Sequence, residues 1–526
     1  MWRQLQEHLP NKIISCGVCY EAAQTFTDNR YKEIDAYTER QMENDFNNTK
    51  SKALTSLMWS FMEKFGAQCV TFVVSIVLAR LLEPDAYGVL GIVVVFMEIL
   101  NVFVDSGLGN ALVQKKDADA VDFSSVFFFN ILMCTALYLL LFAAAPFIAD
   151  YFRIPKLSAV IRVMGLSLIF SGINNVQKAF VARQLKFKRF FFATLGGTLG
   201  AAVVGILLAV KGCGVWALVG QSLFSSFANT VILWFTVKWR PMWSFSAKRF
   251  KGLFVYGWKL LVSSIIDTIY NNLRQLIIGK MYSAESLAFY NRGYMIPNTF
   301  VGSINSSIDS VLLPVMSSAQ DNPESVKAMT RRSVRISSYV MWPIMLGIAA
   351  CSEALVSVLL TDKWLPSVPF VIIFCISYAF KPLETANLNA IKALGRSDIF
   401  LKLNLIKKLI GFIILAATMW FGTLVMAWSY LLFAVVNQII NIFPNRKLLN
   451  YSYRQQMADF LPSMLLAGAM FAIVYSLKFL GLTNWLTLLI QVPTGVLIYL
   501  AGSKLFKFDS FDYILNTLKS LSKNAK

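Results

Sequence analysis

Apolar stretches alternate with short polar loops along the chain from Leu57 to Phe506. Each stretch approaches or exceeds the roughly 20 helical residues that are needed to cross a hydrocarbon core. We predict fourteen membrane-spanning helices, at residues 57–82, 87–104, 123–147, 160–181, 190–210, 215–237, 254–281, 295–315, 334–360, 368–393, 403–421, 425–443, 460–480 and 485–506. A soluble protein is the poorer interpretation, because so many apolar segments would overfill one globular interior. The pattern therefore predicts an all-α polytopic membrane protein.

Lysine and arginine residues gather in every second loop between the predicted spans. The loops that follow the even-numbered spans, together with the C-terminal tail, hold 27 of them, whereas the intervening loops hold 7. Under the positive-inside rule, this bias predicts that both termini lie in the cytoplasm. The net charge of +20 is spread over these loops and forms no continuous basic stripe, so nucleic acid is not an expected partner.

Residues 1–53 form a polar N-terminal extension, in which no apolar segment follows the first Met, so we predict no signal peptide. Cys16 and Cys19 have CxxC spacing, but a structural zinc site needs four ligands and His8 is the only histidine of the chain. We therefore expect neither a metal site nor a cofactor. The polar run that begins at Met42 leads directly into the first span, so Met42 is an alternative start, with residues 1–41 as an upstream artefact or a disordered arm.

Ionisable side chains are numerous inside the predicted spans, although such groups are costly in lipid and normally face a bundle interior or a watery cavity. On the seventh span, polar residues fall within about 120° of one another at 100° per residue; they are Lys259, Ser263, Asp267, Tyr270, Asn271 and Arg274. Further charged candidates are Glu63 and Lys64 in the first span, Glu98 and Asp105 in the second, and Lys381 and Glu384 in the tenth. An internal ion pair or a snorkelling side chain would explain any one of them. Their distribution over four helices predicts a shared, polar central chamber.

The chain also contains a weak internal repeat. The first span ends in LARLLEPDAYG at 78–88 and the seventh in IGKMYSAESLAFY at 278–290, which puts Arg80 and Lys280 in corresponding places. Many transporters are built from duplicated halves that hold the substrate between them. We predict an N-terminal lobe at 54–253, a C-terminal lobe at 254–458, and two appended helices with a basic cytoplasmic tail at 459–526.

Several sequence blocks resemble polysaccharide transporters of the Wzx type, in the WzxC branch. The most specific similarity lies in WSFMEKFGAQ at 59–68, LARLLEPDAYGVLG at 78–91 and DSGLGNALVQKKDADAVDFSSVFFFN at 105–130. Further matches are AAPFIADYF at 144–152, RRSVR at 331–335 and ALGRSD at 393–398, and the similarity extends from about Met42 to the end of the chain. The resemblance implies the fold of the multidrug/oligosaccharidyl-lipid/polysaccharide exporters, in which two six-helix lobes form a V around a central cavity.

The resemblance also implies a cargo, namely an oligosaccharide linked to polyprenyl (undecaprenyl) diphosphate. Such a flippase moves its cargo from the cytoplasmic to the outer leaflet of the bacterial inner membrane, among membrane lipids, for O-antigen, capsule or exopolysaccharide synthesis. Glycosyltransferases and a polymerase would be its partners. A diphosphate cannot cross hydrocarbon unaided, so the cavity must supply cations and hydrogen bonds. We expect the diphosphate to meet Lys64, Arg80, Lys259, Arg274 and Lys381. Charge balance, or uptake of H+ or Na+ in ion-coupled transport, would rest on Glu63, Glu98, Asp105, Asp267 and Glu384.

Other functions fit the sequence less well. A drug or cation antiporter of the same superfamily conflicts with a cavity rich in lysine and arginine, which would repel a cationic drug. A membrane-embedded oligosaccharide polymerase or ligase would be expected to carry a large outer loop, yet the longest predicted one spans only 282–294. A receptor or scaffold leaves the charges within the spans unexplained. We therefore expect a transporter and no enzyme.

Overall fold

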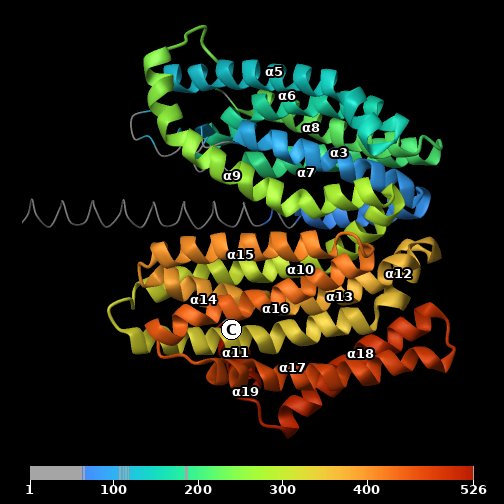
Figure 1. Ribbon diagram of the computed structural model, residues 1–526, viewed down its shortest axis with the longest axis vertical. Coiled ribbons are helices and arrows are strands. Elements are labelled where there is room, and N and C mark those ends of the chain that lie inside the picture. Colours follow the sequence, from blue (N-terminus) through green and yellow to red (C-terminus); the bar gives the residue numbers. More distant parts are fainter. Residues whose placement is uncertain are drawn as a thin grey trace, which may run out of the picture.

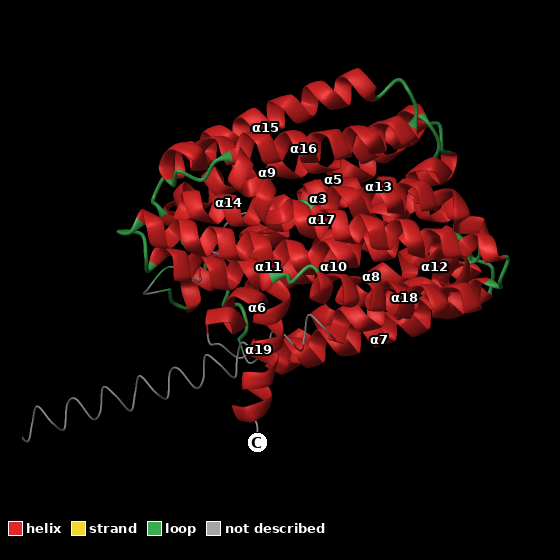
Figure 2. Ribbon diagram, turned by 90° about the horizontal axis from the view of Figure 1, so that it is seen from below, coloured by secondary structure: helices red, strands yellow, loops and turns green. Residues whose placement is uncertain are grey.

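The computed structural model describes residues 62, 66–105, 108–109, 112, 115, 118–183, 188–237 and 239–524. These residues form helices that run roughly side by side in two bundles, stacked one above the other in Figure 1. Figure 2 shows helices and connecting loops but no strand in the part of the chain that is drawn as described. The predicted all-α class is confirmed.

The first bundle contains a helix at Gly66–Leu81, α3 (Pro84–Asp105), α5 (Ala120–Phe152), α6 (Pro155–Arg183), α7 (Lys188–Val210) and α8 (Val215–Thr236). The next helix, α9 (Ala247–Met281), lies along the first bundle in Figure 1 and leads into the second. The second bundle contains α10 (Ala284–Ser317), α11 (Pro323–Ala350), α12 (Ser352–Leu360), the 3-10 turn η1 (Asp362–Ser367), α13 (Val368–Ala379), α14 (Lys381–Ala393), α15 (Ser397–Thr418) and α16 (Thr423–Leu448). Appended to it are α17 (Tyr453–Ser476), η2 (Leu477–Leu480), α18 (Asn484–Leu505) and α19 (Asp509–Asn524).

Every predicted span coincides, over its described residues, with one helix or with two consecutive helices. By length and composition, nine helices in the described ranges could cross a membrane, and two shorter apolar helices add to them. Fourteen crossings and the lobe boundaries stay predictions. The basic tail contains a helix that the sequence interpretation missed, because the residues of α19 form no apolar stretch. This helix runs across the other helices (Figure 2). It is held to α11 by the Arg332 guanidinium, which lies 4.0 Å from the Tyr513 ring centroid.

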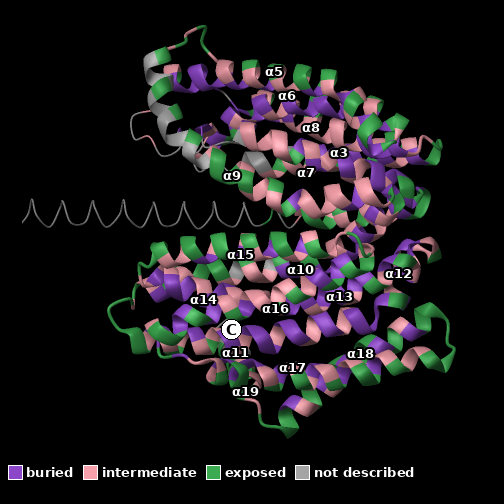
Figure 3. Cartoon of the chain, viewed as in Figure 1, coloured by how far each residue is buried: buried purple, intermediate pink, exposed green. Residues whose placement is uncertain are grey.

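The outer faces of the helices are apolar. Figure 3 shows buried residues on the sides of helices that face one another and exposed residues along the periphery. On α15, one exposed face carries Leu401, Leu405, Leu409, Phe412 and Ile413. An apolar surface of this extent is unusual for a soluble monomer and is what contact with acyl chains requires. The structure therefore describes a multi-span membrane protein.

The two ends of the structure are held by different contacts. At one end, called the Trp364 end, lie η1 and the starts of α3 and α10. At the opposite end, called the Asp459 end, the carboxylate of Asp459 accepts hydrogen bonds from Arg331 Nε at 2.8 Å, Arg335 Nε at 2.6 Å and Tyr451 Oη at 2.8 Å. These bonds join α11 to α17.

The predicted tenth span is broken at Phe380, between α13 and α14. Pro382 occupies the second position of α14, where its missing N–H and its ring oppose a continuous helix. Gln438 Nε2 on α16 donates to the Phe380 carbonyl oxygen at 3.2 Å, so the break is bonded to its neighbour. The first turn of α14 therefore begins inside the bundle.

A tight turn brings α14 and α15 together. Gly395 has φ of +71°, a left-handed conformation that favours glycine. Arg396 donates from Nε and Nη2 to the two carboxylate oxygens of Asp398, each at 3.0 Å. The hydrogen bonds from Arg396 lower the pKa of Asp398 to about 2. The ALGRSD segment thus folds the chain back, and the first turn of α14 meets the middle of α15.

The bundles approach most closely where α3 crosses α10. A Cβ atom added to Gly88 would lie 1.7 Å from the Ala284 carbonyl oxygen, which is backbone and has little freedom to move. We expect Gly88→Ala to lower the midpoint of thermal unfolding, with a loss of at least about 1–3 kcal/mol from overpacking. Gly302→Ala on α10 is the matched control, because no heavy atom lies within 4 Å of the added Cβ. Equal midpoints for the two purified variants would contradict this packing.

Candidate functional site

A cavity of about 680 Å³ lies on the side of the second bundle that faces the first. Its walls come from α9, α10, α13, α14, α15 and α16, and Glu98 on α3 completes them. This volume is within the range of small-molecule sites. Polar and charged side chains line much of it, as in a chamber built for a hydrated or anionic ligand.

The centre of the site is an ion-pair triad, defined as Lys381, Glu384 and Lys407. Lys381 Nζ lies 2.9 Å from one carboxylate oxygen of Glu384, and Lys407 Nζ lies 3.2 Å from the other. Lys381 remains 44% exposed, whereas Glu384 and Lys407 are 13% and 9% exposed. The break at Phe380 and the α14–α15 turn produce this arrangement, because they place the first turn of α14 against α15. Two ammonium groups thus hold one anion at the cavity wall.

Further charged groups surround the triad. The Arg274 guanidinium donates to the carbonyl oxygen of Met426 and, at 2.8 Å, to Ser429 Oγ, which fixes it against α16. Lys408 on α15 forms an ion pair with Asp267 on α9. Across the cavity, Glu98 accepts a hydrogen bond from Asn272 Nδ2 at 2.8 Å.

Cations exceed anions on the described cavity wall. The lining contains Arg274, Lys381, Lys407 and Lys408, but only Glu98 and Glu384 as carboxylates. The pairing of Asp267 with Lys408 still leaves positive charge in excess. Glu384 and Lys407 are largely buried, and in such surroundings charge attracts an anion more strongly than it would at an open surface. The cavity therefore favours anionic ligands.

One part of the wall is aromatic. The ring centroids of Tyr294 and Tyr378 are 5.7 Å apart, and those of Tyr378 and Tyr430 are 6.2 Å apart. Tyr290 and Phe433 also line the cavity. Aromatic rings with hydroxyl groups can pack against the C–H faces of sugars and also donate hydrogen bonds.

The structure brings together four of the ten residues that the sequence proposed for the site: Glu98, Arg274, Lys381 and Glu384. Asp267 lies beside the cavity through its ion pair with Lys408. Arg80 lies elsewhere, at the Trp364 end, where its guanidinium donates to the carbonyl oxygens of Val358 and, at 2.8 Å, Leu359. Outside the described residues or side chains are Glu63, Lys64, Asp105 and Lys259, as are His8, Cys16, Cys19 and Met42.

The sequence interpretation missed Lys407 and Lys408. With Asn404 and Gly411, they line the cavity from positions i, i+3, i+4 and i+7 of α15. This spacing marks one face of a helix, which lies beside the apolar stripe of α15. The same face analysis that was applied to the seventh span would have found them.

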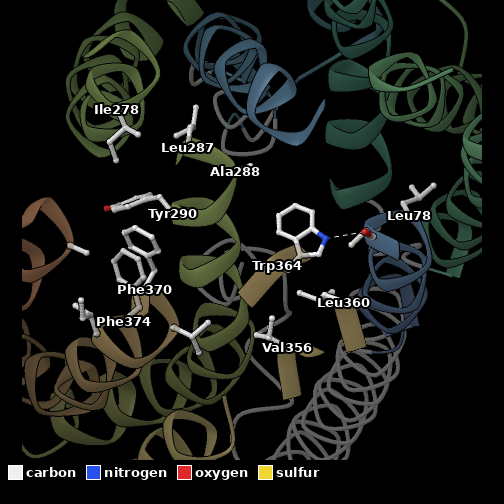
Figure 4. Packing of buried hydrophobic residues seen from close by; sticks show 14 of the residues in the cluster. Leu78, Ile278, Leu287, Ala288, Tyr290, Val356, Leu360, Trp364, Phe370 and Phe374 are labelled. Atoms are coloured by element: carbon white, nitrogen blue, oxygen red, sulfur yellow. Dashed lines mark hydrogen bonds between the residues drawn. The ribbon is translucent and has the colours of Figure 1, made fainter. Parts of the chain in front are cut away.

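At the Trp364 end, side chains from both bundles interlock (Figure 4). The indole N–H of Trp364 donates to the Ala79 carbonyl oxygen at 2.9 Å. The Arg292 guanidinium lies between two rings, 4.8 Å from the Tyr87 centroid and 4.9 Å from that of Trp364, and donates to Ser75 Oγ at 3.1 Å. These contacts, called the Trp364 closure, join the helix 66–81 and α3 to α10 and η1. The bundles are held together at this end.

Comparison with known proteins agrees with this architecture. The family described as "Polysaccharide biosynthesis protein" matches residues 77–369, more than half of the chain. The chain belongs to this family. Teichuronic acid biosynthesis protein TuaB of Bacillus subtilis is 24% identical over 76% of this chain and 84% of the relative. Lipopolysaccharide biosynthesis protein WzxC of Escherichia coli is 22% identical over 86% of this chain and 88% of the relative. The resemblance seen in the sequence is confirmed.

The fold also has a solved counterpart. The lipid II flippase MurJ, in an inward closed conformation, superimposes with a TM-score of 0.69 at 14% sequence identity, covering 86% of this chain and 98% of MurJ. At this identity, the likeness concerns the fold alone. It supports the predicted two-lobed helical fold.

Proposed function

We propose that the protein is a flippase, which moves an oligosaccharide linked to a polyprenyl diphosphate across the bacterial cytoplasmic membrane for surface polysaccharide synthesis. The observation that carries the proposal is the cavity with excess positive charge, centred on the triad and lined by helices of both bundles. Family membership supports a role in polysaccharide biosynthesis. We propose no catalytic reaction for this chain.

The triad supplies the diphosphate site in this proposal. An ammonium group forms charge-assisted hydrogen bonds with phosphate oxygens, and the two lysines already hold Glu384 as an internal anion. The diphosphate replaces the carboxylate between Lys381 and Lys407, and the positive N-terminal end of α14 adds to the attraction. Arg274 is fixed by its bonds to α16, and its positive charge attracts the diphosphate from a distance.

Access to the cavity follows from the Trp364 closure. Since the bundles are joined at that end, the cargo enters from the side of the Asp459 end. The loop charges predict that the Asp459 end is cytoplasmic, so this conformation receives cargo from the inner leaflet. Release requires the Trp364 closure to open. The polyprenyl chain stays in lipid between helices, because only the charged headgroup needs a polar route.

Coupling to an ion gradient would act through the carboxylates. Glu98 and Glu384 line the cavity and Asp267 lies next to it, whereas none of the described cavity-lining residues is histidine. Uptake of H+ or Na+ by these groups would change how strongly the lysines bind the cargo. Glycosyltransferases must supply the lipid-linked oligosaccharide, and a polymerase or ligase must consume it on the other side.

The test uses purified full-length protein in proteoliposomes that contain undecaprenyl diphosphate linked to a fluorescently labelled oligosaccharide. We expect the protein to move the label between leaflets, as measured by the fraction that a membrane-impermeant quencher reaches. Liposomes without protein set the background rate. If the protein moves no diphosphate-linked glycan but exchanges a cationic dye for H+ or Na+, the antiporter alternative replaces this proposal.

A further inference from the structure

Beyond the triad, α10 carries a line of amide and carboxylate side chains. Asn291, Asn298, Asn305 and Asp309 follow one another at intervals of seven, seven and four residues. At 100° per residue, these intervals place the four residues on one face of α10, over about 27 Å of helix. Asn291 and Asn298 line the cavity, and Figure 1 shows α10 on the side of the second bundle that faces the first.

The line continues onto α14. Thr385 Oγ1 donates to Asn305 Oδ1 at 2.7 Å, and Asn389 Nδ2 donates to Asp309 Oδ1 at 2.8 Å. Thr385 and Asn389 are buried, whereas Asn298 and Asp309 are exposed. Exposed amide and carboxylate groups on a long helix of a membrane bundle require water or a polar ligand, because acyl chains cannot satisfy them. The line leads from the triad toward the Asp459 end.

The chemistry of this line differs from that of the triad. Amide groups both donate and accept hydrogen bonds, as sugar hydroxyls do, and none of the six residues is a cation. At the adjoining cavity wall, Asn437 and Gln438 add two further uncharged amide side chains. The arrangement fits an uncharged polyhydroxylated ligand next to an anionic one.

We infer that this line is the glycan track of the transporter. It is defined by Asn291, Asn298, Asn305 and Asp309 on α10 with Thr385 and Asn389 on α14. The inference rests on the proposed function, and it adds a substrate class: the sugars that follow the diphosphate are uncharged where they pass Asp309. A uronic acid at that place would meet the Asp309 carboxylate, and like charges repel.

Two substitutions separate a glycan contact from a structural role. Asn298→Ala removes an exposed amide from the cavity wall, so it should leave the folded structure intact. Asp309→Asn keeps the size of the side chain and an acceptor for Asn389, but it removes the negative charge. Asn516→Ala, at an exposed position on α19, is the matched control.

The probes are geranyl diphosphate, geranyl diphosphate that carries a neutral disaccharide, and the same compound with a terminal hexuronic acid. Binding to the purified full-length protein is measured by intrinsic fluorescence. We expect the probe with the neutral disaccharide to bind about 10-fold more tightly than geranyl diphosphate, because the sugar forms a few hydrogen bonds with the protein. Asn298→Ala should reduce this gain to about 3-fold or less, because the disaccharide then loses at least one hydrogen bond to the protein. Wild type should bind the acidic probe about 5-fold more weakly than the neutral one, and Asp309→Asn should remove that difference.

The outcomes distinguish the two proposals. If wild type binds geranyl diphosphate and the neutral disaccharide probe equally well, the glycan track is wrong and the diphosphate site stands. If the disaccharide gain survives in Asn298→Ala, or the preference for the neutral probe survives in Asp309→Asn, the track is likewise overturned. If no diphosphate probe binds wild type, both the track and the proposed function fail.

Discussion

Replacement of both Lys381 and Lys407 by alanine is expected to weaken the binding of inorganic pyrophosphate by at least about 100-fold. Each lysine would lose a charge-assisted hydrogen bond to phosphate, worth roughly 1.5–3 kcal/mol. The same variant is expected to abolish flipping in the proteoliposome assay. Isothermal titration calorimetry on the purified full-length protein measures the binding.

The double variant also leaves Glu384 without its two cations, so loss of folding must be separated from loss of binding. A second variant, with glutamine at 381, 384 and 407, removes all three charges and keeps hydrogen-bonding groups. It should fold and still fail to bind pyrophosphate. Lys402→Ala is the matched control, because Lys402 lies on α15 with Lys407 but is exposed and does not line the cavity. Pyrophosphate affinity retained by the glutamine variant would exclude the triad as the diphosphate site.

Trp364→Ala is expected to be the most destabilising change at the Trp364 closure. The indole is fully buried, packs edge-on against Tyr87 at 5.3 Å, and donates its only hydrogen bond across the two bundles. Truncation of a buried tryptophan costs about 3–5 kcal/mol, and here the Arg292 guanidinium also loses one of its two rings. We expect a lower unfolding midpoint and faster hydrogen–deuterium exchange in residues 79–87.

Trp420→Ala provides the matched comparison, because Trp420 follows α15 and is 68% exposed. It should leave the midpoint and the exchange of residues 79–87 unchanged. Protection of those residues in Trp364→Ala at the level of wild type would mean that the bundles are held together by other contacts.

The elements of this fold are readable from sequence because lipid imposes a simple rule. Twenty apolar residues in a row must form a helix, and charges inside such a run must face polar surroundings. That rule found Glu98, Arg274, Lys381 and Glu384. It missed Lys407 and Lys408 because they lie near the start of the predicted eleventh span, close to Lys402, where basic residues look like those of an ordinary loop.

The position of Arg80 could not be predicted in the same way. Its acceptors, the carbonyl oxygens of Val358 and Leu359, are more than 270 residues away in the chain, and they belong to the other bundle. A charge in a span indicates that polar surroundings exist, but not which ones. The packing of the two bundles decides whether such a residue faces the cavity or ties the bundles together.

The break at Phe380 has a mechanical consequence. A helix bends sharply only where its backbone hydrogen bonds are interrupted, and the boundary between α13 and α14, with Pro382 at the second position of α14, is such a place. At the joint, the Phe380 carbonyl oxygen accepts a hydrogen bond from Gln438 Nε2 on α16 at 3.2 Å and one from the Glu384 N–H at 3.3 Å. A bond of this kind is worth about 1 kcal/mol. Any tilt of α14, which carries Lys381, would therefore turn about Phe380, and it would have to exchange the hydrogen bonds that Asn387 makes with Gln456 and Asn445.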